Sequence, residues 1–426
     1  MTWLTILFVV PIAYAQETPT VLKPNQLVTF SLAPGQEKAF VLPMKKGDFV
    51  GIESLAPEGV DLTLVIYDAA RKELLEKPIW GEDSLWFVAQ TDGDFVFVVT
   101  LEKDKNSQIS GTQRISVQYS NKFRLPVGSK QEDIRRINGY SIRIIRTPAS
   151  DNESKSIVLF EKNRQLKRVL QSSGGEAKGF SFPYPDHISK TDPAELRREI
   201  LLINSTPDKT GDGIPDVMIQ YFSGGAHCCF AMYFTNLGET VQTVDILEMA
   251  DVEVVKVDKN PVGGLVFHTF DIWGYWNTSF ATSPWVEVIL EFKNGKLRPN
   301  FNLMKKPAPS LAVLKNKAEF YRQKLSLAPY RGDKNYGPPD FKDPLYKEDT
   351  HPDNQDVKYK GTVLRNVVFW GPMLDLIYTG HEDLAWQFLD LVWPAQKQGK
   401  ALFIRDFKNQ LSQSRYWQMI LEDNNK

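Results

Sequence analysis

The sequence predicts a mainly β protein with an α-helical C-terminal region, and three observations lead to this fold class. Short segments of alternating apolar and polar residues, separated by turn residues, fill most of the chain up to residue 304. From residue 305 onward the apolar residues recur at helical spacing. The chain has 426 residues, of which 42% are hydrophobic and 24% charged, so we expect a folded protein with more than one domain.

Residues 1–15 have the pattern of a secretory signal peptide. An apolar run over residues 3–12 is followed by the small-x-small triplet Ala13-Tyr14-Ala15, which predicts cleavage before Gln16. The run is shorter than the roughly 20 residues that span a bilayer, and no later segment is long enough either. We therefore expect an exported protein, periplasmic or extracellular, with no transmembrane segment.

Charge and cysteine content narrow the class of protein further. The formal net charge of -1 provides no basic surplus with which to displace counterions, so no nucleic-acid partner is predicted. The chain has 2 cysteines, and because they are adjacent they cannot staple distant segments together. The low cysteine count favours a bacterial secreted protein, and its stability must come from packing, to which a metal ion could add.

Residues 20–120 are predicted to form an antiparallel β-sandwich. Period-two segments at residues 28–32, 38–42, 61–67, 95–101 and 114–119 are separated by turn residues such as Pro34-Gly35 and Thr91-Asp92-Gly93. The residue patterns at 36–40, 46–50, 59–64 and 91–95 make this segment resemble the prepeptidase C-terminal type of bacterial jelly-roll domain. That resemblance implies an accessory binding or secretion-associated module rather than a catalytic one.

Residues 134–304 are predicted to form a second β-rich domain. Within it, residues 157–166 and 289–297 echo each other, since each places Lys-Asn at a tight turn between two apolar strands. Asn tolerates the left-handed backbone that such turns require. Two hairpins of similar local chemistry are the simplest explanation of the echo.

A loop at residues 208–216 has the pattern of a calcium site. Calcium prefers several oxygen ligands at once, and a loop presents them at alternating positions. Here Asp208, Thr210 and Asp212 stand at positions one, three and five, the Ile214 carbonyl at seven and Asp216 at nine. Gly211 and Gly213 permit the sharp backbone reversal that turns these oxygens inward.

The loop fits some classes of calcium site better than others. An EF-hand would need a glutamate at position twelve, where this chain has Ile219, so the EF-hand hypothesis fails. The pattern resembles instead the short calcium loops of FG-GAP and related β-propeller-type repeats. An Asp- and Gly-rich turn that binds nothing is the remaining alternative. We expect a structural rather than a catalytic Ca²⁺ ion.

The string Gly224-Gly-Ala-His-Cys-Cys229 allows three interpretations. Cys228 and Cys229 are buried free thiols, or they form a strained vicinal disulfide in an oxidising compartment, or His227 and Cys229 together serve a transition metal or a catalytic step. Further metal ligands could come only from His268, Asp271 or Glu287, which are distant in sequence.

Aromatic residues cluster between His268 and Trp276. Such residues form either the core strands of a β domain or a platform that binds carbohydrate or peptide. His381, like His187 and His351, has no neighbours at ligand spacing and is interpreted as a surface or capping residue.

The last third of the chain is predicted to contain helices on either side of a linker. Leu314, Ala318, Tyr321 and Leu325 share one face of a helix over residues 312–325. A proline-rich linker follows within residues 305–361, and residues 362–426 form an α-helical module. Its helices are expected at 364–378 and 384–393, followed by an amphipathic segment that carries Phe407, Leu411 and Trp417.

These features predict an exported, non-enzymatic binding or envelope-associated protein with an unidentified protein or glycan ligand. We assign no catalytic residue and no organic cofactor. The alternative is a secreted hydrolase with a site around His227, Cys228 and Cys229. No nucleophile elbow, HExxH helix or spaced pair of carboxylates supports that alternative.

Overall fold

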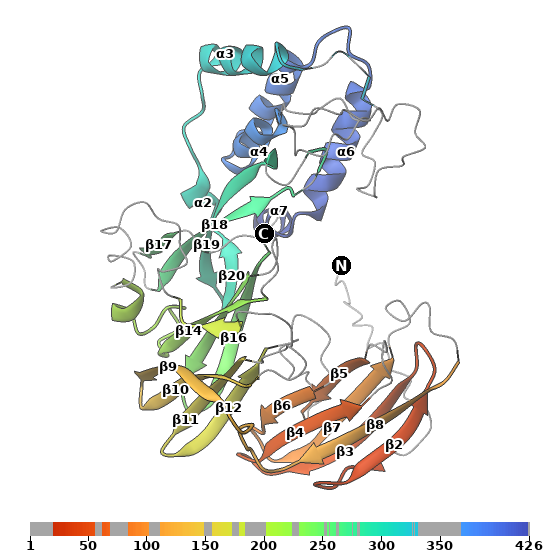
Figure 1. Cartoon of the computed structure of the whole chain (residues 1–426). Helices are drawn as coiled ribbons and strands as arrows, with labels where there is room; N and C mark the ends of the chain where they lie inside the picture. The colour runs from red at the N-terminus through yellow and green to blue at the C-terminus, as the bar shows by residue number, and fades with distance from the viewer. Residues whose placement is uncertain are drawn as a thin grey trace, which may run out of the picture. The chain divides into compact units, whose positions relative to one another are not determined.

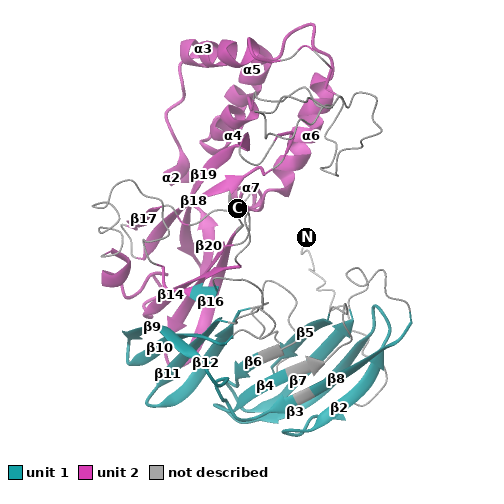
Figure 2. Ribbon diagram, viewed as in Figure 1, with its two compact units in different colours: residues 1–180 teal, residues 181–426 magenta. Residues whose placement is uncertain are grey.

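A computed structural model describes residues 20–55, 62–68, 84–101, 111–148, 156–172, 179–183, 202–223, 230–250, 254, 256–260, 264–274, 276–278, 282–325, 327, 329–330 and 368–424. The fold is mainly β with helices near the C-terminus, as the sequence predicts (Figure 1). The chain divides into two compact units, Met1–Phe180 and Ser181–Lys426 (Figure 2). The predicted signal peptide, most of the predicted linker and the string that contains Cys228 and Cys229 lie outside the described residues.

The N-terminal unit contains a β-sandwich made of two four-stranded sheets. The first sheet has the order β1 (Thr20–Val21), β3 (Glu37–Met44), β7 (Gly93–Leu101) and β5 (Leu62–Tyr67). The second has the order β2 (Leu27–Leu32), β8 (Gln113–Ser120), β4 (Phe49–Leu55) and β6 (Ser84–Val88). All strand pairs are antiparallel except β1 with β3.

Alternation along the strands explains why the two sheets face each other. In β5 every second residue is buried, beginning with Leu62, as expected for a strand with one face on the core. Phe40, Phe97 and Val117, which come from both sheets, are fully buried in one apolar cluster. The predicted sandwich is therefore confirmed, including the strands that were expected from period-two patterning.

A third sheet belongs to the same unit. Its strands β9 (Lys130–Ile137), β10 (Tyr140–Arg146), β11 (Ser156–Lys162) and β12 (Gln165–Gln171) form an antiparallel meander. Ile157 and Leu159 of this sheet share an apolar cluster with Phe49 and Val88 of the sandwich. The compact units thus divide at residue 180, whereas the sequence suggested a boundary near residue 134. The domain limits drawn from the sequence stay a prediction.

The second unit begins inside the short strand β13 (Gly179–Ser181) and contains two further meanders. One runs through β14 (Asp216–Phe222), β15 (Phe230–Leu237) and β16 (Val241–Ala250). The other runs through β17 (Lys256–Lys259), β18 (Leu265–Ile272), β19 (Trp285–Lys293) and β20 (Lys296–Pro299). The Phe234 ring meets the rings of Phe267 and Phe292 at centroid distances of 5.0 Å, so the two sheets share one core.

The two similar segments, residues 157–166 and 289–297, form the corresponding hairpin of two different meanders. Asn163 and Arg164 join β11 to β12, and Asn294 and Gly295 join β19 to β20, all with positive φ angles. Two-residue turns of this kind match the twist of the flanking strands. The predicted hairpins are confirmed, and each is the last hairpin of a four-stranded meander.

The helices of the second unit continue the core of its sheets. Among the described residues, the helices that follow β20 are α2 (Phe301–Met304), α3 (Leu311–Arg322), α4 (Trp370–Tyr378), α5 (Glu382–Val392), α6 (Lys400–Gln413) and α7 (Arg415–Asn424). Leu314 and Ala318 of α3 are buried, as predicted, and Tyr321 is partly buried. The final amphipathic segment is divided at Ser414 into two helices. One apolar cluster contains residues of both sheets and of α3 to α7.

Candidate functional site

Asp208 organises the predicted calcium loop through its side chain. Its Oδ1 accepts hydrogen bonds from the backbone N–H groups of Gly211 at 2.6 Å and Asp212 at 3.2 Å, and its Oδ2 accepts one from Gly213 at 2.7 Å. Gly211 and Gly213 have φ angles of 82° and 87°, a region that glycine enters without the steric cost of a Cβ. The sharp reversal predicted at these two glycines is therefore present.

Asp212 connects the loop to the neighbouring strand. Its Oδ1 accepts the N–H of Ile214 at 2.9 Å, and its Oδ2 accepts a hydrogen bond from Nδ2 of Asn236 at 2.7 Å. Asn236 lies on β15 opposite Asp216. The loop is thus fixed to two paired strands and does not depend on its own sequence alone for its shape.

Asp216 is the internal carboxylate of the loop. Asp216 is fully buried, at 0% exposure. Its Oδ2 accepts hydrogen bonds from the N–H groups of Lys209 at 2.8 Å and Thr210 at 2.9 Å. Its Oδ1 is buried without a hydrogen-bond partner. Burial raises the pKa of Asp216 to about 6, although the backbone N–H groups of Thr210 and Lys209 and the side chain of Thr210 all lower it, and the charge of Asp212 adds to the increase.

The oxygens of the 208–216 loop are of the chemical type that calcium binds, although all three aspartates accept hydrogen bonds from backbone N–H groups. Thr210 Oγ1 lies 3.4 Å from Asp208 Oδ1, and carboxylate, hydroxyl and carbonyl oxygens are the ligands that this hard cation prefers. Within the described residues, no three His, Cys, Asp or Glu side chains gather closely enough to hold a metal ion. The five predicted ligand positions belong to one compact loop, and calcium binding itself stays a prediction.

Gly264 supports the loop from the next sheet. The N–H of Leu265 donates to the Lys209 carbonyl at 2.9 Å, and Gly264 has a φ angle of 72°. A Cβ added at Gly264 would lie 2.9 Å from the Lys209 carbonyl oxygen and 3.1 Å from the Gly211 nitrogen. This close approach leaves no room for a side chain.

We therefore expect Gly264→Ala to lower the free energy of unfolding by about 2–5 kcal/mol, since backbone strain and overpacking add. Gly213→Ala is a matched control, because its φ angle is 87° but a Cβ there meets nothing within 4 Å. It should cost only the backbone term of about 1–2 kcal/mol. Urea unfolding of both variants measures the difference, and equal losses would contradict the close approach.

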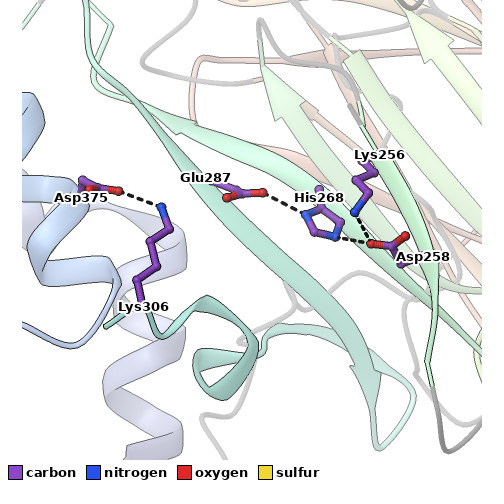
Figure 3. A network of polar contacts seen from close by, with 6 residues as sticks. All are labelled: Lys256, Asp258, His268, Glu287, Lys306 and Asp375. Atoms are coloured by element: carbon purple, nitrogen blue, oxygen red, sulfur yellow. Dashed lines mark hydrogen bonds and ion pairs between the residues drawn. The ribbon is translucent and has the colours of Figure 1, made fainter. Parts of the chain in front are cut away.

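A second polar cluster surrounds His268 on β18 (Figure 3). Its Nδ1 lies 3.0 Å from Glu287 Oε1 and its Nε2 lies 3.1 Å from Asp258 Oδ2. Lys256 Nζ donates to the same Asp258 oxygen at 2.6 Å. Burial alone would raise the pKa of Asp258, but Lys256 and His268 together hold it below its ordinary value. Both ring nitrogens of His268 thus face carboxylates, so neither is left to activate a nucleophile.

A third cluster lies where β18 meets the helices, with Asp271 partly buried and Tyr378 and Ser414 buried. Asp271 Oδ2 accepts hydrogen bonds from the Tyr378 hydroxyl of α4 and, at 2.6 Å, from Ser414 Oγ. The two hydroxyl oxygens lie 2.8 Å apart, and Ser414 Oγ also accepts the N–H of Trp417 at the start of α7. Burial raises the pKa of Asp271, although the two hydroxyl donors oppose the shift. Asp271 therefore joins the sheet to three helices.

This raised pKa makes a pH-dependent contribution whose sign follows from linkage. The folded pKa of Asp271 lies above its ordinary value of 3.8, so the folded chain retains this proton longer as the pH rises. Its contribution is complete below about pH 4 and is lost as the pH rises through the folded pKa. In Asp271→Asn, the amide oxygen still accepts both hydroxyls but does not titrate. We expect its free energy of unfolding, relative to the original chain, to increase with pH in urea titrations. A difference that is constant with pH would contradict this assignment.

Some of the remaining candidates from the sequence lie within the described residues, and the others lie outside them. Trp273 and Trp276 are buried in the apolar core of the second unit, in edge-to-face contact at 5.2 Å. The core alternative is therefore correct for these two residues, and they do not form an exposed binding platform. His381 precedes α5 and lies 2.7 Å, through Nε2, from the Lys306 carbonyl. His227, Cys228 and Cys229 lie outside the described residues.

Comparison with known proteins gives structural neighbours only. No family model matches the chain, and no curated protein sequence matches it. A pre-peptidase C-terminal domain of collagenase from Bacillus anthracis is 14% identical, with 25% of this chain and 99% of that chain covered at a TM-score of 0.21. A periplasmic inhibitor of g-type lysozyme from Aeromonas hydrophila is 10% identical, with 24% and 95% covered at a TM-score of 0.21. The corresponding inhibitor from Salmonella Typhimurium is 9% identical, with 24% and 100% covered at a TM-score of 0.18.

The class that the fold defines is thus a mainly β protein with an N-terminal β-sandwich and C-terminal helices. Membership of the prepeptidase C-terminal family stays a prediction from the sequence pattern. Among the described helices, none is long and apolar enough to cross a membrane.

Proposed function

We propose that this chain is an exported, non-enzymatic binding protein whose second unit is held rigid by a calcium ion at residues 208–216. The observation that carries the proposal is the unpartnered Oδ1 of the fully buried Asp216. A buried carboxylate oxygen without a partner is costly, and a cation beside it offsets that cost. Asp208, Thr210, Asp212 and the Ile214 carbonyl would supply the other oxygens, in the manner of an FG-GAP-like loop, once the ion draws the Asp208 and Asp212 carboxylates away from their N–H donors.

The contacts of His268 and His381, the two histidines among the described residues, favour a binding rather than a catalytic role. His268 has a carboxylate at each ring nitrogen, and Nε2 of His381 meets a backbone carbonyl. In the part of the chain that the structure describes, no histidine contacts a hydroxyl or thiol that it could activate. A structural ion in a loop that joins strands suits a rigid scaffold that presents a binding surface.

Isothermal titration of Ca²⁺ into the chelator-treated protein tests the metal. We expect one calcium-binding event that Asp212→Asn weakens strongly, because this change removes a charged oxygen at position five. Glu239→Gln, an exposed carboxylate in the turn between β15 and β16, should leave the titration unchanged. The absence of heat in the original chain would contradict the proposal.

The hydrolase alternative is tested separately. Ester, peptide and glycan substrates are screened with the original chain and with His227→Ala. Turnover that disappears in this variant would replace the binding proposal with the hydrolase.

A further inference from the structure

A pocket opens between α3, α4 and α5, in the segment that leads from the sheets to the helices. It has a volume of about 160 Å³. Pro307, Pro309, Leu314, Pro372 and Phe388 contribute apolar surface to it. Because proline has a fixed backbone angle and few side-chain rotamers, this surface is pre-organised and loses little entropy when a ligand binds.

The volume limits what the pocket can hold. A dry cavity of about 150 Å³ accommodates one benzene molecule, whereas pockets for whole small molecules measure about 300–1,000 Å³. The pocket therefore suits one ring-sized or branched aliphatic group. A ligand with more atoms must continue outside it.

Cations stand around this apolar surface. Lys306 and Lys317 both line the pocket. Asp375, the carboxylate of the lining, forms an ion pair with Lys306, with 3.1 Å between Lys306 Nζ and Asp375 Oδ1 (Figure 3). Among the described residues, Lys317 has no hydrogen-bond or ion-pair partner. The ligand that complements this arrangement carries a negative charge next to its apolar group.

The outward face of α3 extends the apolar contact beyond the pocket. Val313, Lys317 and Phe320 follow one another at helical spacing and share one face. Val313 is 55% and Phe320 53% exposed, and Lys324 Nζ lies 3.6 Å from the centre of the Phe320 ring. This face alternates apolar and cationic groups, so it suits a chain with apolar and acidic side chains.

We propose that this pocket and the adjoining face of α3 bind an acidic peptide segment that inserts one apolar side chain, while Lys317 pairs with a carboxylate beside it. The inference deepens the proposed binding function by naming a ligand class. It does not involve calcium or the 208–216 loop.

The first experiment detects binding to the pocket with 4-fluorophenylacetate, which combines one ring with one carboxylate, by fluorine NMR of the probe. Neutral 4-fluorobenzyl alcohol is the comparison. We expect the acid to bind several-fold more tightly than the alcohol. Lys317→Glu should weaken the acid about fivefold or more, since an attraction becomes a repulsion, and Val313→Trp should weaken it by obstructing the pocket.

Lys315→Glu is the matched control, because Lys315 is an exposed lysine of the same helix that does not line the pocket. It should have little effect on the acid. Equal binding of acid and alcohol, equal effects of the two lysine variants, or no binding at millimolar probe would each overturn the proposal. Circular dichroism of the variants confirms that they are folded.

The second experiment tests whether the ligand is a peptide. A blocked hexapeptide with one Phe among Glu residues should displace the fluorinated acid, and the same peptide with Lys in place of Glu should not. Displacement by both peptides or by neither would overturn the peptide assignment, and displacement by neither would indicate a small aromatic acid. Repeating the titration in chelator separates the two hypotheses, since a failure of calcium binding leaves this result intact.

Discussion

Replacing Phe403 by alanine is expected to lower the free energy of unfolding by about 3–5 kcal/mol, the usual cost of removing a large buried ring. Phe403 on α6 is fully buried. Its ring meets those of Trp276, Tyr330, Phe369 and Trp393 at centroid distances of 5.8, 5.5, 5.0 and 5.4 Å. Alanine would leave a cavity among rigid rings that cannot close around it.

The same variant tests whether the helices and the sheets of the second unit unfold together. Because Phe403 and Trp276 belong to one apolar cluster with strands β14 to β20, we expect hydrogen exchange to accelerate in β15 and β18 as well as in the helices. Phe320→Ala, at an exposed ring of α3, should cost less than about 0.5 kcal/mol. Faster exchange confined to the helices would show instead that residues 362–426 form a separate module.

The sandwich and the tight hairpins could be predicted from the sequence because local signals determine them. Period-two alternation places Leu62 and the residues that follow it on a core face, and Asn294-Gly295 requires a left-handed turn whatever surrounds it. The helix around Leu314 and Ala318 was predictable for the same reason, since its apolar spacing is visible within a single segment.

The sharing of one core by sheets and helices was not predictable in this way. Asp271 and Ser414 are 143 residues apart, and no local pattern indicates that an aspartate on a strand meets a serine between two helices. The pocket was not predictable either, because it is formed by residues distant in sequence: Leu314, Pro372 and Phe388 come from three helices. Their separate spacings indicate only that each helix has a buried face.

The candidate metal loop could be predicted from the sequence only in part. Its ligand pattern and its glycines are local, so residues 208–216 could be identified from the sequence. The burial of Asp216 and the close approach of Gly264 depend on pairing with β15 and on the neighbouring sheet, which the sequence does not reveal. The structure therefore adds a buried Asp216 oxygen without a hydrogen-bond partner, and the calcium ion itself stays a proposal.

Calcium is accordingly expected to raise the unfolding temperature of the chelator-treated protein, and Asp216→Asn is expected to abolish that response. A ligand at 100 times its Kd stabilises the folded state by about 2.7 kcal/mol, which corresponds to roughly 5–10 °C for a unit of this size. In the variant, the amide oxygen still accepts the N–H groups of Lys209 and Thr210. Asp216→Asn should therefore keep the calcium-free fold, while the ion loses a charged carboxylate ligand.

Differential scanning calorimetry with excess chelator and with excess calcium measures the response. Glu239→Gln removes a nearby exposed charge that occupies no ligand position, so it should retain the full calcium-dependent shift. The same shift in Asp216→Asn would mean that any calcium acts elsewhere on the chain. The absence of a shift in the original protein would mean that the buried oxygen is tolerated without a cation, and that residues 208–216 form a turn closed by its own N–H groups.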